Sequence, residues 1–170
     1  MAIDHDIRVV DLPKFVDERG AFSKYFDSKN PSLNNFVIQQ VNHVVNPRIG
    51  VLRGLHFQLG FHAESKLFRV LKGEIQLVAF CWDKTNENYS TCFSCVLKNN
   101  ESSILIPKGY ATGYLVLSAD THVLYFSDNV YEPSAERGIR WNDPVLKVKW
   151  MLGSIEVSDK DKNWKDFETD

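Results

Sequence analysis

Short apolar runs, rather than a helical repeat, dominate this sequence. β-Branched and aromatic residues gather in brief runs, and no long segment spaces them at the 3.6-residue period of a helix. We therefore expect strands at 7–10, 36–41, 67–71, 75–82, 92–97, 103–106, 114–117 and 121–126. Turn-forming residues lie between several of them, at 72–73, 84–88, 98–102 and 107–109. This spacing is typical of an antiparallel sandwich or barrel, so we predict an all-β fold.

The chain is expected to form one domain over residues 1–170. It shows neither an internal repeat nor an interdomain linker, and its 170 residues are enough to bury a full core. Its hydrophobic fraction of 44% and charged fraction of 25% are typical of a globular protein. Short peripheral helices are predicted near 28–34 and in the charged C-terminal tail that starts at about residue 159.

Charge and hydropathy exclude several kinds of partner. The net charge is −2 and the basic residues are scattered, which argues against a nucleic-acid-binding surface. The apolar runs all fall well short of the ~20 residues that a membrane helix needs. Residues 1–6 are polar and acidic, unlike a secretory signal. We therefore expect a cytoplasmic protein that binds neither nucleic acid nor membrane.

The three cysteines are too few for a disulfide framework. Cys92 and Cys95 form a C-x-x-C pair, but they lie in a predicted strand that points them to opposite faces. A second ligand pair for zinc is not visible. We expect both to be buried thiols.

Residues 51–58 (VLRGLHFQ) hold the most reactive pair of side chains. The planar guanidinium of Arg53 suits a phosphate, and the imidazole of His56 is a candidate base near neutral pH. On an extended strand, a gap of three residues places them on opposite faces, roughly 10 Å apart. An exposed arginine and a hydrogen-bonded histidine near a strand end remain an equally good interpretation of these residues alone.

Several motifs occur along the chain in one order. They are 51–58 with Lys66, IPKGYATGY at 106–114, Tyr125 with Tyr131, and GIRWNDP at 138–144, extended by DERGAF at 17–22, Gln40 with Asn42, and SDKD at 158–161. Over residues 7–161 this order resembles the nucleotide-sugar epimerases typified by dTDP-4-dehydrorhamnose 3,5-epimerase. The RGLH and WNDP elements are quite specific to that family.

The resemblance implies a cupin-type double-sheet jelly-roll barrel. Metal-binding cupins usually carry histidines where this sequence has Gln58 and Thr112, which leaves His56 and Glu64 as ligands. A catalytic metal normally has three protein ligands. We therefore expect no metal and no cofactor.

The resemblance also implies a substrate and a set of catalytic roles. The substrate would be a nucleoside-diphospho-4-keto-6-deoxyhexose, in deoxysugar or surface-polysaccharide biosynthesis such as that of lipopolysaccharide O-antigen. His56 would remove a proton beside the ketone, and Asp161 would orient that histidine. Lys66 would stabilise the enolate oxygen, and Tyr125 would return a proton from the opposite face.

Further positions match substrate-binding residues of the family. They are Arg19, Phe22, Lys24, Gln40, Asn42, Arg53, Thr112 and Tyr131. Proteins of this family pair through sheet extension, and a small barrel leaves edge strands that need cover. We therefore expect a homodimer in which 7–10 and 22–26 are edge or exchanged segments.

Each catalytic residue has an ordinary interpretation when taken alone. Lys66 could lie on the solvent face of its strand, Tyr125 could be a core aromatic, and Asp161 could belong to a solvated tail. Only their shared order favours the catalytic roles. Trp141 and Asp143 are expected to be structural, because WNDP indicates a turn fixed by proline.

The sequence departs from the family at several positions that would recognise the substrate. Lys24 stands where a glutamate is usual, Thr112 where a histidine is usual, and 76–77 and 80–83 lack the usual acidic run. Two alternatives therefore stay open. The chain could bind a nucleotide sugar without turning it over, or it could invert only carbon 3 on a nucleotide other than thymidine. A metal-dependent cupin enzyme is disfavoured by Gln58 and Thr112.

Overall fold

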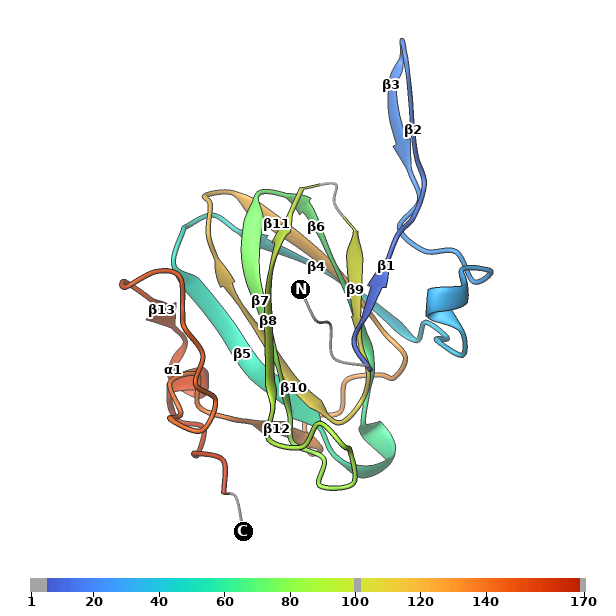
Figure 1. Cartoon of the computed structure of the whole chain (residues 1–170). Coiled ribbons are helices and arrows are strands. Elements are labelled where there is room, and N and C mark those ends of the chain that lie inside the picture. The colour runs from blue at the N-terminus through green and yellow to red at the C-terminus, as the bar shows by residue number, and fades with distance from the viewer. Residues whose placement is uncertain (1–5, 100–101, 169–170) are drawn as a thin grey trace.

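The structure is a computed structural model that describes residues 6–99 and 102–168, and in these ranges it is built almost entirely of strands (Figure 1). The all-β prediction is confirmed. Most of residues 1–6, on which the prediction about a secretory signal rests, lie outside the described residues. Within the described ranges, no helix is long and apolar enough to cross a membrane.

Two sheets form the body of the molecule. The first has the order β1-β9-β6-β11-β4, with β1 at Arg8–Val10, β9 at Ser103–Ile106, β6 at Lys66–Lys72, β11 at Thr121–Ser127 and β4 at Gln40–Asn46. The second has the order β12-β5-β10-β7-β8, with β12 at Glu136–Gly138, β5 at Val51–Gln58, β10 at Tyr110–Val116, β7 at Glu74–Cys81 and β8 at Cys92–Lys98. A short strand, β13 (Glu156–Val157), pairs in parallel with β5.

Small elements lie around this body. A separate hairpin joins β2 (Lys14–Asp17) to β3 (Gly20–Ser23), and Figure 1 shows it standing away from the two sheets. Two 3-10 turns, η1 (Pro31–Leu33) and η2 (Gly60–His62), and one short helix, α1 (Asp159–Lys162), complete the described chain. The helical turns predicted near 28–34 and after 159 are therefore confirmed.

Most predicted strands are present, with two informative differences. The strand expected to start at residue 114 begins at Tyr110. Ala111 and Gly113 pair with β7, although small residues of this kind give little strand signal in the sequence. The strand expected to start at residue 36 begins at Gln40 instead. Phe36 packs in an apolar cluster on the outer side of the first sheet rather than in its ladder.

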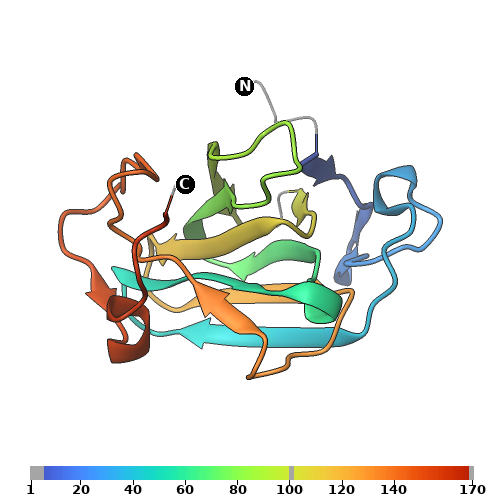
Figure 2. The ribbon, with the colours of Figure 1, turned by 90° about the horizontal axis from the view of Figure 1, so that it is seen from below.

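Apolar side chains fill the space between the sheets and cover both outer faces. The central cluster includes Phe68, Leu77 and Val123, which come from both sheets. The N-terminal segment covers the first sheet, and the C-terminal segment covers the second (Figure 2). The described segments near both termini therefore bury apolar surface against the sheets, and the C-terminal segment is held against β5.

A β-bulge corrects the expected placement of Arg53 and His56. Thr112 of β10 pairs with His56 and Tyr114 pairs with Arg53, so two steps along β10 correspond to three steps along β5. The extra residue turns both side chains to the same face, where they line one cavity. The prediction of opposite faces was wrong, because it assumed a regular strand.

The bulge depends on Gly54. Its φ is +115°, and an added Cβ would lie 2.6 Å from the Thr112 carbonyl oxygen and from the Gly113 Cα atom. No side chain fits this close approach of β5 to β10.

The cysteines form no disulfide. Cys95 is buried as expected, whereas Cys92 is exposed, so the prediction of two buried thiols was half wrong. Regular alternation along the edge strand β8 accounts for the difference, since it points one thiol inward and the other outward.

We predict that Gly54→Ala lowers the free energy of unfolding by about 3 kcal/mol or more, through a strained φ and a backbone clash. Gly20→Ala is the matched control. Gly20 has a φ of +132° but no atom within 4 Å of an added Cβ, so we expect a loss of about 1–2 kcal/mol. Urea unfolding of the two variants would measure both losses of free energy. Equal losses would contradict the proposed close approach of β5 to β10 at Gly54.

Candidate functional site

A short hydrogen bond joins two residues that are 105 positions apart. His56 Nε2 lies 2.5 Å from Asp161 Oδ1, and the Asp161 side chain is only 6% exposed. Because an ionised carboxylate only accepts hydrogen bonds, Nε2 carries the proton and donates it. The other ring nitrogen, Nδ1, is then left with a lone pair, as a general base requires.

The C-terminal segment delivers Asp161 to this position. Strand β13 pairs with β5, and the Ser158 hydroxyl then caps α1 by accepting from the Asp161 N–H. The Asp161 carboxylate also accepts from the Gly54 N–H at 3.2 Å and from Trp164 Nε1 at 3.3 Å. Burial alone would raise the pKa of Asp161, but the hydrogen bonds from His56, Gly54 and Trp164 outweigh it and lower that pKa.

Trp164 is a supporting residue that sequence reasoning missed. Its ring lies against Gly138, where an added Cβ would be 2.4 Å from the indole, and it meets the His56 ring edge-on at 6.3 Å. The available signal was its position three residues after Asp161, just beyond the C-terminal end of α1.

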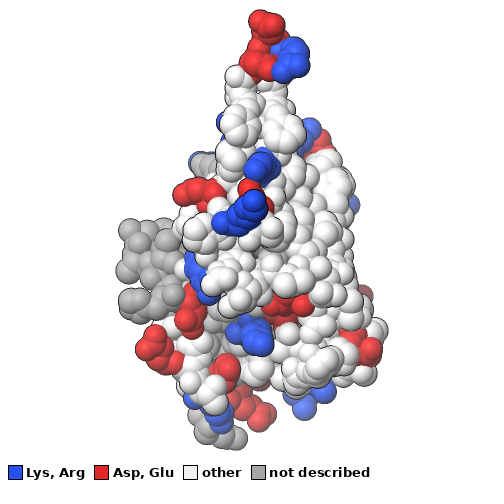
Figure 3. Space-filling model, turned by 90° about the vertical axis from the view of Figure 1, so that its right-hand side faces the viewer, with Lys and Arg blue, Asp and Glu red and all other residues white. Residues whose placement is uncertain are grey.

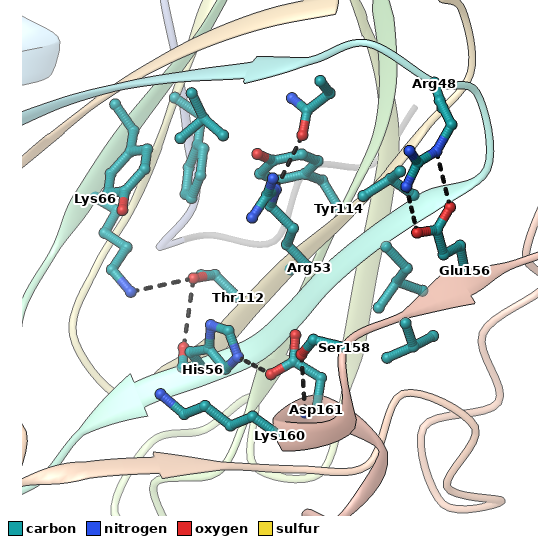
Figure 4. Close-up of a pocket in the computed structure, with 18 of the residues that line it drawn as sticks. Arg48, Arg53, His56, Lys66, Thr112, Tyr114, Glu156, Ser158, Lys160 and Asp161 are labelled. Carbon is teal, nitrogen blue, oxygen red and sulfur yellow. Dashed lines mark hydrogen bonds and ion pairs between the residues drawn. The ribbon is translucent and has the colours of Figure 1, made fainter.

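His56 and Asp161 line a cavity between the two sheets. This cavity has a volume of about 520 Å³, and a smaller one of about 280 Å³ shares three of its lining residues, His56, Lys66 and Tyr125. His56 projects from β5 of the second sheet, whereas Lys66 and Tyr125 project from β6 and β11 of the first. Figure 4 shows the His56 ring and the Lys66 ammonium turned into the same space.

Lys66 is held inside the site rather than on the solvent face. Its side chain is 12% exposed, and its ammonium lies 3.0 Å from Glu64 Oε1 and 3.5 Å from Thr112 Oγ1. The Thr112 hydroxyl in turn donates to the His56 carbonyl oxygen at 3.4 Å. Sequence reasoning named Glu64 only as a possible metal ligand and missed this ion pair, because the spacing of two residues gave no sign of burial.

Tyr125 is a partly buried phenol on the wall opposite His56. Its ring stacks on Phe68 with centroids 5.4 Å apart. Burial, followed by the negative charge of Glu64, raises the pKa of Tyr125 above its usual value of 10. The hydroxyl therefore keeps its proton at neutral pH and can donate it.

Positive side chains surround the larger cavity. Arg53 Nε donates to Asn46 Oδ1 at 2.9 Å, which fixes the guanidinium at the cavity wall. Arg48 pairs with Glu156 at the same cavity, and Lys160 also lines it. The arginines and Lys160 suit an anionic ligand such as a diphosphate.

The smaller cavity gathers three other predicted binding residues. Gln40 donates to Asn42 Oδ1 at 3.0 Å and accepts from the Tyr131 N–H at 2.9 Å. The buried Asn42 Nδ2 has no partner among the described residues. Tyr131 donates its hydroxyl to Glu136 at 2.6 Å, and Lys160 donates to the same carboxylate oxygen at 2.6 Å. The loop after β11 and helix α1 are thereby tied together.

Three predicted binding residues lie elsewhere. Arg19, Phe22 and Lys24 belong to the projecting hairpin or follow it directly, and none of them lines a described cavity. Arg19 pairs with Asp17, and Lys24 pairs with Asp27. Within one chain, these side chains do not join the site.

Gln58 is a structural anchor at the position where metal-binding cupins have a histidine. Its amide donates to the carbonyl oxygens of His62 and Val130, and it accepts from the Glu132 N–H at 2.6 Å. Asp143 is buried and accepts from Phe167, which is the structural role expected for the WNDP turn.

Comparisons with known proteins point to one family. The sequence profile of the dTDP-4-dehydrorhamnose 3,5-epimerase family matches residues 3–169. The dTDP-4-dehydrorhamnose 3,5-epimerase of Methanothermobacter thermautotrophicus is 35% identical over 163 residues, which cover 92% of this chain and 87% of that protein.

Two solved structures are similar throughout. The Bacillus anthracis enzyme of the same name, with TDP and PPi bound, has a TM-score of 0.88 and 30% identity, covering 94% of this chain and 93% of that one. The Legionella pneumophila dTDP-6-deoxy-D-glucose-3,5-epimerase, in complex with dTDP-4-keto-L-rhamnose, has a TM-score of 0.86 and 29% identity, with coverages of 95% and 93%. The expected barrel fold is confirmed.

The lowered pKa of Asp161 predicts a pH-dependent contribution to stability. A carboxyl whose pKa is lower in the folded state stabilises the fold above its unfolded pKa of about 3.9, and this contribution is lost as pH falls through the folded pKa. As pH falls below about 4, the difference in unfolding free energy between wild type and Asp161→Asn should therefore shift against the wild type. A difference that stays constant down to pH 2.5 would contradict the proposed hydrogen bonds to the carboxylate.

Proposed function

Because the chain belongs to the dTDP-4-dehydrorhamnose 3,5-epimerase family, it is an isomerase, and we propose that its substrate is a nucleoside-diphospho-4-keto-6-deoxyhexose. The enzyme inverts carbon 3, carbon 5 or both in deoxysugar biosynthesis. The relatives' names supply the substrate class, and the site supplies groups suited to each chemical step.

One observation carries this proposal, namely that an imidazole and a phenol face one cavity from opposite walls. His56 projects from the second sheet, and Tyr125 projects from the first. Inversion of a carbon centre needs a proton to leave one face of the sugar ring and another to arrive on the opposite face. A ring lying between the two sheets meets both requirements.

The proton transfers follow from this arrangement. His56 Nδ1 takes the proton from the carbon beside the ketone, and the electron pair of that C–H bond forms an enolate. The Lys66 ammonium donates a hydrogen bond to the enolate oxygen, and Tyr125 gives its proton to the opposite face of the carbon. Asp161 stabilises the imidazolium that forms. Solvent then returns a proton to Tyr125 and removes one from His56, so the reaction needs no oxidant or reductant.

The larger cavity accommodates the rest of the substrate. Arg53 and Lys160 would hold the diphosphate, while Gln40, Asn42 and Tyr131 would contact groups that enter the smaller cavity. Thr112 in place of a histidine, and Lys24 in place of a glutamate, are the residues that would alter the preferred nucleotide or the number of centres inverted. A surface-polysaccharide pathway and a cytoplasmic location stay predictions.

We also propose that the working form is a homodimer. The hairpin β2–β3 presents Phe15 and Phe22 at exposures of 58% and 65%, and Figure 3 shows an uncharged surface along its sides below a charged tip. Exposed apolar side chains on an isolated hairpin favour burial against another surface. A second copy would cover them, and Arg19, Phe22 and Lys24 would then reach the partner's cavity.

We predict that the enzyme exchanges substrate hydrogen with deuterium from solvent. NMR of 4-keto-6-deoxy sugars on dTDP, CDP, UDP and GDP should show exchange at carbon 3, carbon 5 or both for at least one nucleotide. His56→Ala should lower turnover by about 10³ or more, because it removes the positioned base, while nucleotide-sugar affinity should change much less.

The panel also separates the alternatives. Binding of a nucleotide sugar with no exchange on any of the four would contradict the epimerase and identify a binding protein. Efficient exchange at both carbons of the dTDP sugar, with no advantage for another nucleotide, would show that Lys24 and Thr112 leave specificity unchanged.

We predict a dimer mass by light scattering at micromolar concentration. Phe22→Asp should shift the mass towards the monomer, because it places a charge in the buried apolar surface. Phe61→Asp is the matched control, because Phe61 is 92% exposed on η2, outside the hairpin, and the dimer should persist. A wild-type monomer would contradict the proposed assembly.

A further inference from the structure

Glu64 has no assigned role in the proposed reaction, although it lies inside the site. Its side chain is 9% exposed, and it lines the smaller cavity together with His56, Lys66 and Tyr125. A carboxylate this deeply buried is costly unless it is paired. It pairs with the ammonium of Lys66, which lies 3.0 Å from its Oε1 atom.

The hydrogen bonds of Lys66 show what this pairing achieves. An ammonium has three N–H donors. Glu64 accepts one at 3.0 Å and Thr112 accepts another at 3.5 Å, while the Thr112 hydroxyl proton is directed at the His56 carbonyl oxygen. Figure 4 shows the ammonium turned toward Thr112 at the edge of the cavity. Among the residues that the structure describes, these two are the partners of the ammonium, so one donor is left for a ligand in the space between the sheets.

The two contacts of the Lys66 ammonium, with Glu64 and with Thr112, differ in strength. The contact with Glu64 is shorter and joins two full charges, whereas the contact with Thr112 lies at the limit of hydrogen-bonding distance. A lysine has a flexible four-carbon stem, whose ordering costs conformational entropy. A fixed partner inside the site is therefore needed to keep the third donor aimed at one point.

We propose that Glu64 is a positioning residue that holds the Lys66 ammonium so that its remaining N–H meets the enolate oxygen, with Thr112 as the weaker second anchor. This inference rests on the proposed function. It also gives Thr112 a role in the site other than that of the family's usual histidine. Because Glu64 acts through Lys66, its contribution is made in the transition state and not in substrate binding.

The test is a double-mutant cycle in the deuterium-exchange assay. Glu64→Gln should lower kcat about tenfold to a hundredfold, with KM within about threefold of the wild type. Lys66→Met should lower kcat at least as much. The double variant should match Lys66→Met within about twofold, because Glu64 has nothing to position once the ammonium is absent. Thr112→Val should cause a smaller loss than Glu64→Gln.

Controls keep the outcomes distinct. Glu74→Gln removes the carboxylate of another glutamate–lysine pair, with Lys98 on the neighbouring strand, and should leave kcat unchanged. If Glu64→Gln does not fold, Glu64→Asp keeps the charge but withdraws it by one methylene, and should still lower kcat. An unchanged kcat in the folded glutamate variant, or losses that simply add in the double variant, would overturn the inference. Absence of exchange by the wild type would instead overturn the proposed function.

Discussion

The hydrogen bond between His56 and Asp161 is the interaction on which the rest of the site depends. It fixes which ring nitrogen carries a proton, and it joins the middle of β5 to a helix near the C-terminus. Three further features keep the carboxylate in place, namely the Gly54 N–H, the Trp164 indole and the Ser158 cap of α1. None of these three contacts with Asp161 would form if the C-terminal segment did not pack against β5.

The same strand explains why the site lies between the sheets. The bulge at Gly54 turns Arg53 and His56 to one face, so a guanidinium and an imidazole enter a single cavity. The opposite sheet supplies Lys66 and Tyr125 to that cavity. A nucleotide sugar lying along β5 could then place its diphosphate beside Arg53 and its ring between His56 and Tyr125.

Sequence patterns predicted the fold class and the order of most strands, because short apolar runs between turn residues have few other solutions. They failed where geometry depends on pairing. The bulge at Gly54 is set by the close approach of β10, and the hairpin β2–β3 has exposed side chains that give no burial pattern. The start of β10 was missed because Ala111 and Gly113 carry little strand preference.

The candidate site was named mainly through motif order, since each residue alone had an ordinary interpretation. The structure brings His56, Lys66, Tyr125 and Asp161 together, while their catalytic roles stay predictions. It also brings in Glu64 and Trp164, whose contributions depend on contacts that no local pattern shows.

The protonation state of His56 tests the central claim most directly. In ¹⁵N NMR of the histidine-labelled protein near pH 8, the His56 ring should show a protonated Nε2 and an unprotonated Nδ1. Asp161→Asn should change this distribution, because the amide can donate to Nε2 as well as accept from it. A wild-type ring protonated at Nδ1 instead would contradict the account, since the nitrogen assigned as the base would then have no lone pair to offer.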